Sequence, residues 1–374
     1  KNKELVMRAT CHPLKSLLTL LCSSLFACAV KAELQPMADS ELAEITGQAL
    51  VTLDGLTYGG FEYTRVNLGA EVDLLTNIDE LRLGNYSRNQ PNTVSNQPAD
   101  IRIDNFALGR VDNANSSNAA VVPFQVRDPY LEFAFKVNGQ GIREVAGIRL
   151  GFGRARGDLS GDIHALTGNM QGLVTGSAAT AREYYMQQNG LNGFTCTFDF
   201  NCLALSLAGN SEIFSQVELV KSGTGDTMIN GQPINRATHI GVPNGESFHT
   251  DNALLEPLLP AIASNNGDCT ASGLPACFSL LNYKSIFVGD RTQADLSVGG
   301  AQGVFFSLQN QNVPWQDLAS ANNQFVATQA GAFANFAKTG EGANTIYPFI
   351  VSLYEALNGA ARVPTCIGDL AKGC

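Results

Sequence analysis

Histidine is scarce in this chain, and the motifs of several common enzyme classes are missing. Only four histidines occur among 374 residues. No H-E-x-x-H sequence is present, so the paired helical ligands of a zinc protease are lacking. No G-x-S-x-G sequence is present, which excludes the nucleophile elbow of α/β-hydrolases. The chain also has no phosphate-binding loop and no dinucleotide-binding fingerprint. We therefore expect a protein that is not an enzyme.

Charge is sparse and mostly negative. Charged residues make up 16% of the chain, with 24 Lys and Arg against 34 Asp and Glu. Residues 1–32 hold five of the basic residues and one of the acidic residues, so the remainder carries 19 basic and 33 acidic residues, a net charge of −14. An acidic chain is repelled by nucleic acids and anionic membranes, so neither is an expected partner. No cofactor is predicted, although this charge is compatible with calcium.

Long apolar runs are absent after the N-terminal segment. That segment starts at Met7, has two basic residues before an apolar run at 17–30, and closes on small residues up to Ala32. The pattern is typical of a secretory signal peptide, with residues 1–6 upstream of the start and cleavage after Ala32. A lipoprotein signal ending at Cys28 is the alternative. No later run is long enough to span a bilayer, so no transmembrane anchor is expected in the mature chain.

Six cysteines follow this leader as three close pairs: Cys196 with Cys202, Cys269 with Cys277, and Cys366 with Cys374. An even number of cysteines in tight local pairs is typical of disulfides in an oxidising compartment. Structural zinc sites are the alternative, but they use shorter spacers and often histidine. We predict three local disulfides, and a protein secreted to the extracellular space or the outer cell surface.

Alternating apolar and polar residues predict a mainly β fold. Apolar side chains occupy every second position between Val66 and Leu74, and again at 131–137. The Asn138-Gly139 pair that follows favours a two-residue type I′ hairpin, and Asn230-Gly231 marks another turn. Many short strands with polar turns predict an antiparallel β-sandwich with a few short helices, one of them at 179–190.

The chain is expected to have three parts. Residues 1–32 form the signal peptide, 33–58 an N-terminal arm, and 59–374 a β-rich body that is one domain or two subdomains. The arm begins with a short helix signal and continues as the β-prone stretch ALVTLDGLTY. Its apolar residues are candidates for contacts with another copy of the chain: Leu50, Val51, Leu53 and Leu56.

One acidic stretch is a candidate for chemistry. In GDLSGDIH, the side chains of Asp158, Asp162 and His164 would suit a cation site or an acid–base pair if they converged. The competing interpretation is a Gly-rich turn between strands with solvated aspartates. Arg156-Gly157-Asp158 also spells an integrin-type tripeptide, but a match of three residues arises often by chance.

A short motif placed directly after the leader carries a resemblance. Residues 39–48 read D-x-E-L-x-x-x-x-G-Q. This resembles the start of a set of uncharacterised exported proteins of Gram-negative bacteria, some of them described as pilus-system or filament-associated proteins. The later stretch GIRLGFGRARGDLSGDI is similar to their β-rich body. The resemblance implies cell-surface or matrix placement and a β-sandwich, and it implies no catalytic residues.

These observations favour a structural subunit of an extracellular filament, fimbria or biofilm matrix, whose partners are copies of itself. The arm would add a strand to the sheet of a neighbour, and such head-to-tail contacts form fibres because they do not close. In the competing interpretation, the same strand pairs within its own chain. An alternative function is a monomeric secreted binding protein for a glycan or an apolar ligand. A hydrolase with an unfamiliar site at residues 158–164 is a third.

Overall fold

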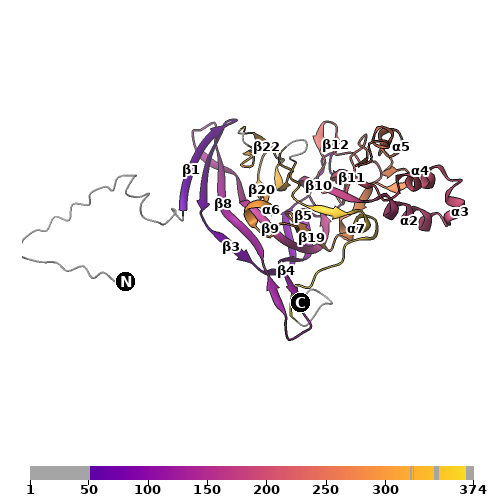
Figure 1. The fold of residues 1–374 in the computed structure, drawn as a ribbon. Helices are drawn as coiled ribbons and strands as arrows, with labels where there is room; N and C mark the ends of the chain where they lie inside the picture. Colours follow the sequence, from indigo (N-terminus) through magenta and orange to yellow (C-terminus); the bar gives the residue numbers. More distant parts are fainter. Residues whose placement is uncertain (1–50, 321, 323, 341–344, 368–374) are drawn as a thin grey trace, which may run out of the picture. The chain divides into compact units, whose positions relative to one another are not determined.

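The computed structural model of the chain describes residues 51–320, 322, 324–340 and 345–367. The predicted leader, the motif at 39–48, Leu50 and Cys374 lie outside these residues. The described chain consists mainly of β-strands, with a few short helices (Figure 1). This confirms the predicted fold class.

Sixteen strands join into one branched hydrogen-bonded network, and nearly all neighbours are antiparallel. Their bounds are β1 (Val51–Tyr58), β2 (Phe61–Leu68), β3 (Glu71–Leu74), β4 (Thr76–Asn85), β5 (Ala99–Leu108), β8 (Phe124–Val137), β9 (Arg143–Ala165), β10 (Gly168–Ser177), β11 (Glu212–Val220), β14 (His239–Gly241), β15 (His249–Thr250), β18 (Cys277–Ser279), β19 (Ser285–Val288), β20 (Ala301–Gln309), β23 (Gly331–Phe336) and β24 (Ile350–Ser352). Only the pairings of β10 with β23 and with β24 are parallel.

Short two-stranded pairs and helices lie outside this network. Four two-stranded pairs are formed by β6 (Arg110–Asp112) with β7 (Ala120–Val122), β12 (Met228–Ile229) with β13 (Gln232–Pro233), β16 (Thr270–Ala271) with β17 (Leu274–Pro275), and β21 (Pro314–Gln316) with β22 (Phe325–Ala327). The helices are α2 (Ala178–Gln188), α3 (Gly193–Cys196), α4 (Phe200–Ala208), η1 (Glu256–Leu258), α5 (Leu259–Ile262), η2 (Leu280–Asn282), α6 (Leu296–Gly299) and α7 (Leu353–Asn358).

Strand β9 connects two parts of the network. Its first half lies between β8 and β20, and its second half pairs with β5 and β19. The change of partners begins at Gly157, which has φ +140°. A Cβ atom there would lie 2.9 Å from the Cα atom of Phe124, so the close approach of the backbones requires glycine.

The predicted hairpin between β8 and β9 is present, but its turn is wider than expected. The loop spans residues 138–142, and its positive φ is at Gly141 (+79°) rather than at Gly139. The side-chain oxygen of Asn138 accepts hydrogen bonds from the backbone N–H groups of Gln140 and Ile142, at 2.9 and 3.0 Å. The prediction of a two-residue type I′ turn is therefore wrong, because the Asn side chain stabilises a longer loop.

Two other local predictions are confirmed. Asn230 and Gly231 have φ +52° and +71° and join β12 to β13, as a type I′ turn requires. The helix expected at 179–190 is α2, which starts after Ser177, whose side chain accepts a hydrogen bond from the Thr180 N–H. Ser is a preferred residue at this position because it satisfies a backbone donor that the helix leaves free.

Two of the three predicted disulfides are confirmed. Cys196 is bonded to Cys202, and Cys269 to Cys277. Cys366 is also disulfide-bonded, but its predicted partner Cys374 lies outside the described residues.

Candidate functional site

Strand β1 forms an open edge of the sheet. It pairs with β2 along its whole length, and the described residues place no other strand against it (Figure 1). The last eight residues of the predicted arm therefore pair within their own chain, as the competing interpretation expected. Among the described residues, no strand pairs with the backbone groups on the other side of β1, which can therefore accept a further strand.

A row of apolar side chains crosses the solvent-facing side of this sheet. Leu53 on β1 lies opposite Val66 on β2, Val66 lies opposite Leu131 on β8, and Leu131 lies opposite Leu150 on β9. Directly opposed residues of neighbouring strands point to the same face. Leu53 is 71% exposed, Leu131 38% and Leu150 47%. The row is therefore open to solvent across four strands.

A second row runs beside the first. Phe133 on β8 lies opposite Ile148 on β9, and Ile148 lies opposite Leu308 on β20. Ile148 and Leu308 are also exposed. We call the two rows together the outer apolar face; its residues are Leu53, Val66, Leu131, Phe133, Ile148, Leu150 and Leu308. Contiguous apolar surface of this kind marks interaction sites in many proteins.

The opposite face of the same sheet buries an ion pair. Glu132 and Arg149 alternate with the outer residues, and they are 2% and 1% exposed. Arg149 donates hydrogen bonds to the Glu132 carboxylate and, at 2.7 Å, to the carbonyl oxygen of Gln316. Its guanidinium also lies 5.2 Å from the ring centroid of Trp315. At this point of the sheet an ion pair is thus buried among the aromatic side chains of the core, while leucines are exposed on the outer side.

An apolar cavity of about 300 Å³ lies at the other end of the described fold, between α4, the η1–α5 segment and the β16–β17 hairpin. Buried side chains form its floor and include Ile213, Phe248, Leu274 and Leu353, whereas exposed side chains at its mouth include Phe200, Leu207 and Leu258. Ser272 is the one polar residue in the lining, and its hydroxyl donates to the Ile262 carbonyl at 2.6 Å. The lining is thus suited to an apolar group and offers little to the hydroxyls of a glycan.

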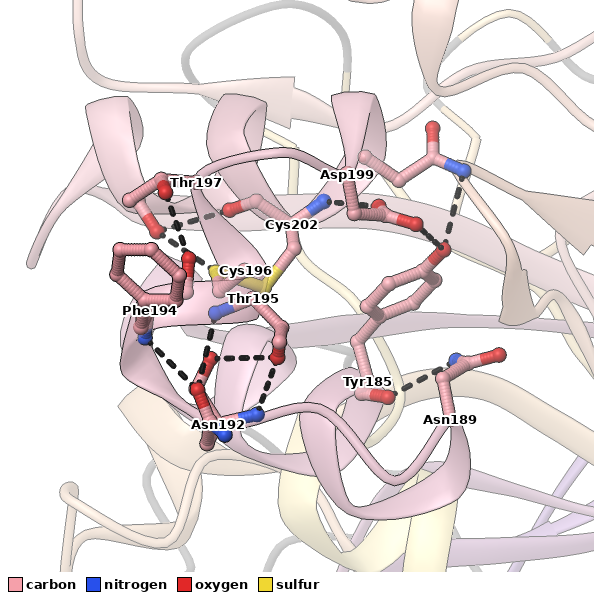
Figure 2. Close-up of a disulfide and its surroundings, with 11 residues drawn as sticks. Tyr185, Asn189, Asn192, Phe194, Thr195, Cys196, Thr197, Asp199 and Cys202 are labelled. Carbon is pink, nitrogen blue, oxygen red and sulfur yellow. Dashed lines mark hydrogen bonds between the residues drawn. A yellow bond between two sulfur atoms is a disulfide. The ribbon is translucent and has the colours of Figure 1, made fainter.

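Two of the three segments that form this cavity are closed by disulfides. The Cys196–Cys202 bond joins α3 to α4 (Figure 2). Its loop contains Phe200, which lies at the mouth of the cavity. Asn192 caps α3 by accepting hydrogen bonds from the N–H groups of Phe194 and Thr195. The Cys269–Cys277 bond encloses the β16–β17 hairpin. The two local cysteine pairs therefore constrain two of the three segments that form the cavity, α4 and the β16–β17 hairpin.

Sequence reasoning identified Leu53 of the outer apolar face but missed the rest of that face and the apolar cavity. Around the first cysteine pair, the stretch FTCTFDF carries three phenylalanines that are each at least 70% exposed, namely Phe194, Phe198 and Phe200. A second available signal was the apolar run at 253–263, because two prolines inside it prevent one regular helix. The structure forms η1 and α5 there, and both contribute to the cavity.

The structure gives each predicted acidic ligand a basic partner of its own. Asp158 is 1% exposed and accepts hydrogen bonds from Arg110 at 2.6 Å and from Arg291 at 3.4 Å. A carboxylate that is buried and neutralised in this way is not available to a cation. For the same reason, the tripeptide at 156–158 cannot present its aspartate to an integrin-type partner.

Asp162 accepts hydrogen bonds from Lys284 and from Asn105. Burial alone would raise the pKa of Asp162, but these two hydrogen bonds and the positive charges of Lys284 and Arg362 together hold the pKa below its usual value. His164 contacts Asp104 instead of the other two predicted residues, with 2.9 Å between Nε2 and Oδ2. Among the residues the structure describes, no group of three or more His, Cys, Asp or Glu side chains is arranged to hold a metal ion.

Comparison with known proteins gives one match. The model of a family described as a family of unknown function (DUF6160) matches residues 12–114, which include the motif at 39–48 and strands β1 to β6. No curated protein and no solved structure matches the chain. In the described part of the chain, none of the helices has the length and apolarity needed to cross a membrane.

Proposed function

We propose that this chain is an exported structural subunit that associates with copies of itself through the outer apolar face, within a filament, fimbria or biofilm matrix on a Gram-negative cell surface. The observation that carries the proposal is the pair of exposed apolar rows across β1, β2, β8, β9 and β20. Full burial of one leucine side chain contributes about 1.5–3 kcal/mol, so burying several at once supports stable association.

Two further features support this proposal. The open edge of β1 lies beside the outer apolar face, so a neighbouring copy can add a strand and cover the apolar rows in one contact. If the added strand comes from a different surface of the neighbour, the contact is head-to-tail, and repeated contacts of this type extend into fibres. The local disulfides are typical of proteins that function outside the cytoplasm.

The Leu150→Lys variant tests the outer apolar face. A lysine at this position puts a charge into the proposed contact, and we expect association to weaken at least about tenfold, which corresponds to about 1.4 kcal/mol. Sedimentation of the purified full chain and negative-stain electron microscopy measure the effect. The matched control is Leu254→Lys, which alters an exposed leucine outside the face and is expected to change nothing. Equal association of both variants would refute the proposal.

Deletion of residues 33–58 separates two modes of association. If the arm leaves its own chain to pair with a neighbour, the deletion abolishes assembly while Leu150→Lys leaves it intact. If the outer apolar face carries the contact, Leu150→Lys weakens assembly by itself. Circular dichroism of each variant monitors whether the β-rich body remains folded.

The apolar cavity favours a second candidate function, the binding of a ligand with a long apolar chain. Each methylene group that enters the cavity contributes about 0.8 kcal/mol, so a single acyl chain binds without any polar contact. We expect a fluorescent long-chain fatty acid to bind the purified protein. Ala204→Trp fills the cavity from α4 and should abolish this binding. Val298→Trp, at an exposed position on α6, should leave it unchanged. Equal binding to both variants would exclude the cavity as the site.

A further inference from the structure

A second type of cavity, of about 280 Å³, lies where β6, β9 and β19 meet, and it shares no lining residue with the apolar cavity. Three arginines line it, Arg110 from β6, Arg156 from β9 and Arg291 from the segment after β19. Gln125 and Phe287 also contribute to the wall. We call it the basic cavity.

The charges in the basic cavity do not balance. Arg110 donates hydrogen bonds to Asp112 at 2.7 Å and to Asp158 at 2.6 Å, and Arg291 donates to Asp158 at 3.4 Å. Two carboxylates thus pair with two arginines and neutralise them. Arg156 has neither an ion pair nor a hydrogen bond from its side chain among the described residues. One positive charge is left over, in a chain whose net charge is −10.

The side chain of Arg156 packs against an aromatic ring but has no hydrogen-bond partner among the described residues. Its guanidinium lies 5.1 Å from the ring centroid of Phe287, and that of Arg291 lies 4.8 Å from the same ring. The Nε atom of Arg156 is buried and has no hydrogen-bond partner in the described part of the chain. A buried donor without a partner costs about 1–3 kcal/mol, and a ligand that accepts from it recovers this cost.

We propose that the basic cavity binds the carboxylate of a small polar ligand of the acidic monosaccharide class. The guanidinium of Arg156 presents N–H donors in a planar fork that fits a carboxylate. One excess positive charge matches a carboxylate better than a phosphate group, which carries about −1.5 to −2. The volume of about 280 Å³ suits one sugar-sized ligand. Gln125, paired with Arg156 across β8 and β9, adds amide groups for hydroxyls.

Titration of the purified full chain with three probes tests this proposal by isothermal calorimetry. Glucuronate is expected to bind. Its neutral methyl ester, which keeps the sugar ring and removes the charge, is expected not to bind. Inorganic phosphate is expected to bind more weakly than glucuronate. Tighter binding of phosphate would overturn the assignment to a carboxylate, and absence of binding by all three probes would overturn the site.

Two variants locate the binding. Arg156→Gln is expected to weaken glucuronate binding at least about tenfold. Arg154→Gln, two residues earlier on the same strand and outside the cavity lining, should leave the affinity within about twofold. Arg156→Lys keeps the positive charge but lacks the planar guanidinium donors, and it is expected to bind glucuronate with intermediate affinity. Thermal unfolding of the free variants shows whether each is folded. Unchanged binding in a folded Arg156→Gln variant would contradict the proposal.

Discussion

Replacing Glu132 by alanine is expected to destabilise the folded chain by about 3–5 kcal/mol, because it leaves a buried arginine without its counter-charge. The side chains of Glu132 and Arg149 are 2% and 0% exposed, so water cannot replace the lost carboxylate. Arg65, which is 3.8 Å from Glu132, also loses this partner. Urea unfolding measures the loss, and the fluorescence of Trp315, the single tryptophan of the chain, reports on this core.

A matched control lies on β1, two strands away from Glu132. Asp54 contacts the same Arg65 at 3.0 Å, but its side chain is 52% exposed. Exposed ion pairs contribute about 0–1 kcal/mol, so Asp54→Ala should have little effect. The combined replacement Glu132→Leu and Arg149→Met removes both charges and is expected to recover much of the lost stability. A similarly small loss for Glu132→Ala and Asp54→Ala would contradict the buried character of the pair.

The two faces of this sheet therefore have separable roles. Glu132 and Arg149 point inward and determine stability, whereas Leu131 and Leu150, their direct neighbours in sequence, point outward and are proposed to determine association. Leu150→Lys should weaken association without a change in the urea midpoint. Glu132→Ala should shift the midpoint strongly. A variant set of this kind separates a loss of contact from a loss of folding.

Local signals in the sequence were sufficient for much of the fold. The turn at Asn230-Gly231, the helix α2 and the pairs Cys196–Cys202 and Cys269–Cys277 each depend on residues close together in the chain. Alternation also identified the strands of the β8–β9 hairpin. Their turn was mispredicted because the side chain of Asn138 bonds to the loop backbone, an outcome that the Asn-Gly pair alone does not reveal.

The sites could not be predicted, for two physical reasons. Alternation shows which residues share a face but not which face is buried, and in β8 it is Glu132 rather than the neighbouring leucine that lies inside. The basic cavity joins Arg110, Arg156 and Arg291, which are far apart in sequence and meet only through strand pairing. Asp158 was identified from its local motif, but the arginines that neutralise it were not.

Removing the Cys269–Cys277 bond by serine substitution at both positions is expected to lower the free energy of unfolding by about 2–3 kcal/mol, since the bond closes a short loop. The larger consequence is expected at the apolar cavity. The β16–β17 hairpin inside that loop supplies Ala271 and Leu274 to the lining, and its two strands are only two residues long. Without the disulfide, so short a hairpin depends on the burial of Ala271 and Leu274 and on the Ser272–Ile262 hydrogen bond to keep its position.

Binding of the fluorescent fatty acid should therefore be lost in this double variant, while assembly and glucuronate binding persist, because the outer apolar face and the basic cavity lie on other strands. The double variant Cys196→Ser and Cys202→Ser provides the matched test for the α4 side of the cavity. Fatty-acid binding that survives both changes would mean that the walls hold their shape by packing alone. Loss of assembly together with fatty-acid binding would instead place the cavity within the subunit contact, and would join the two proposed functions at one surface.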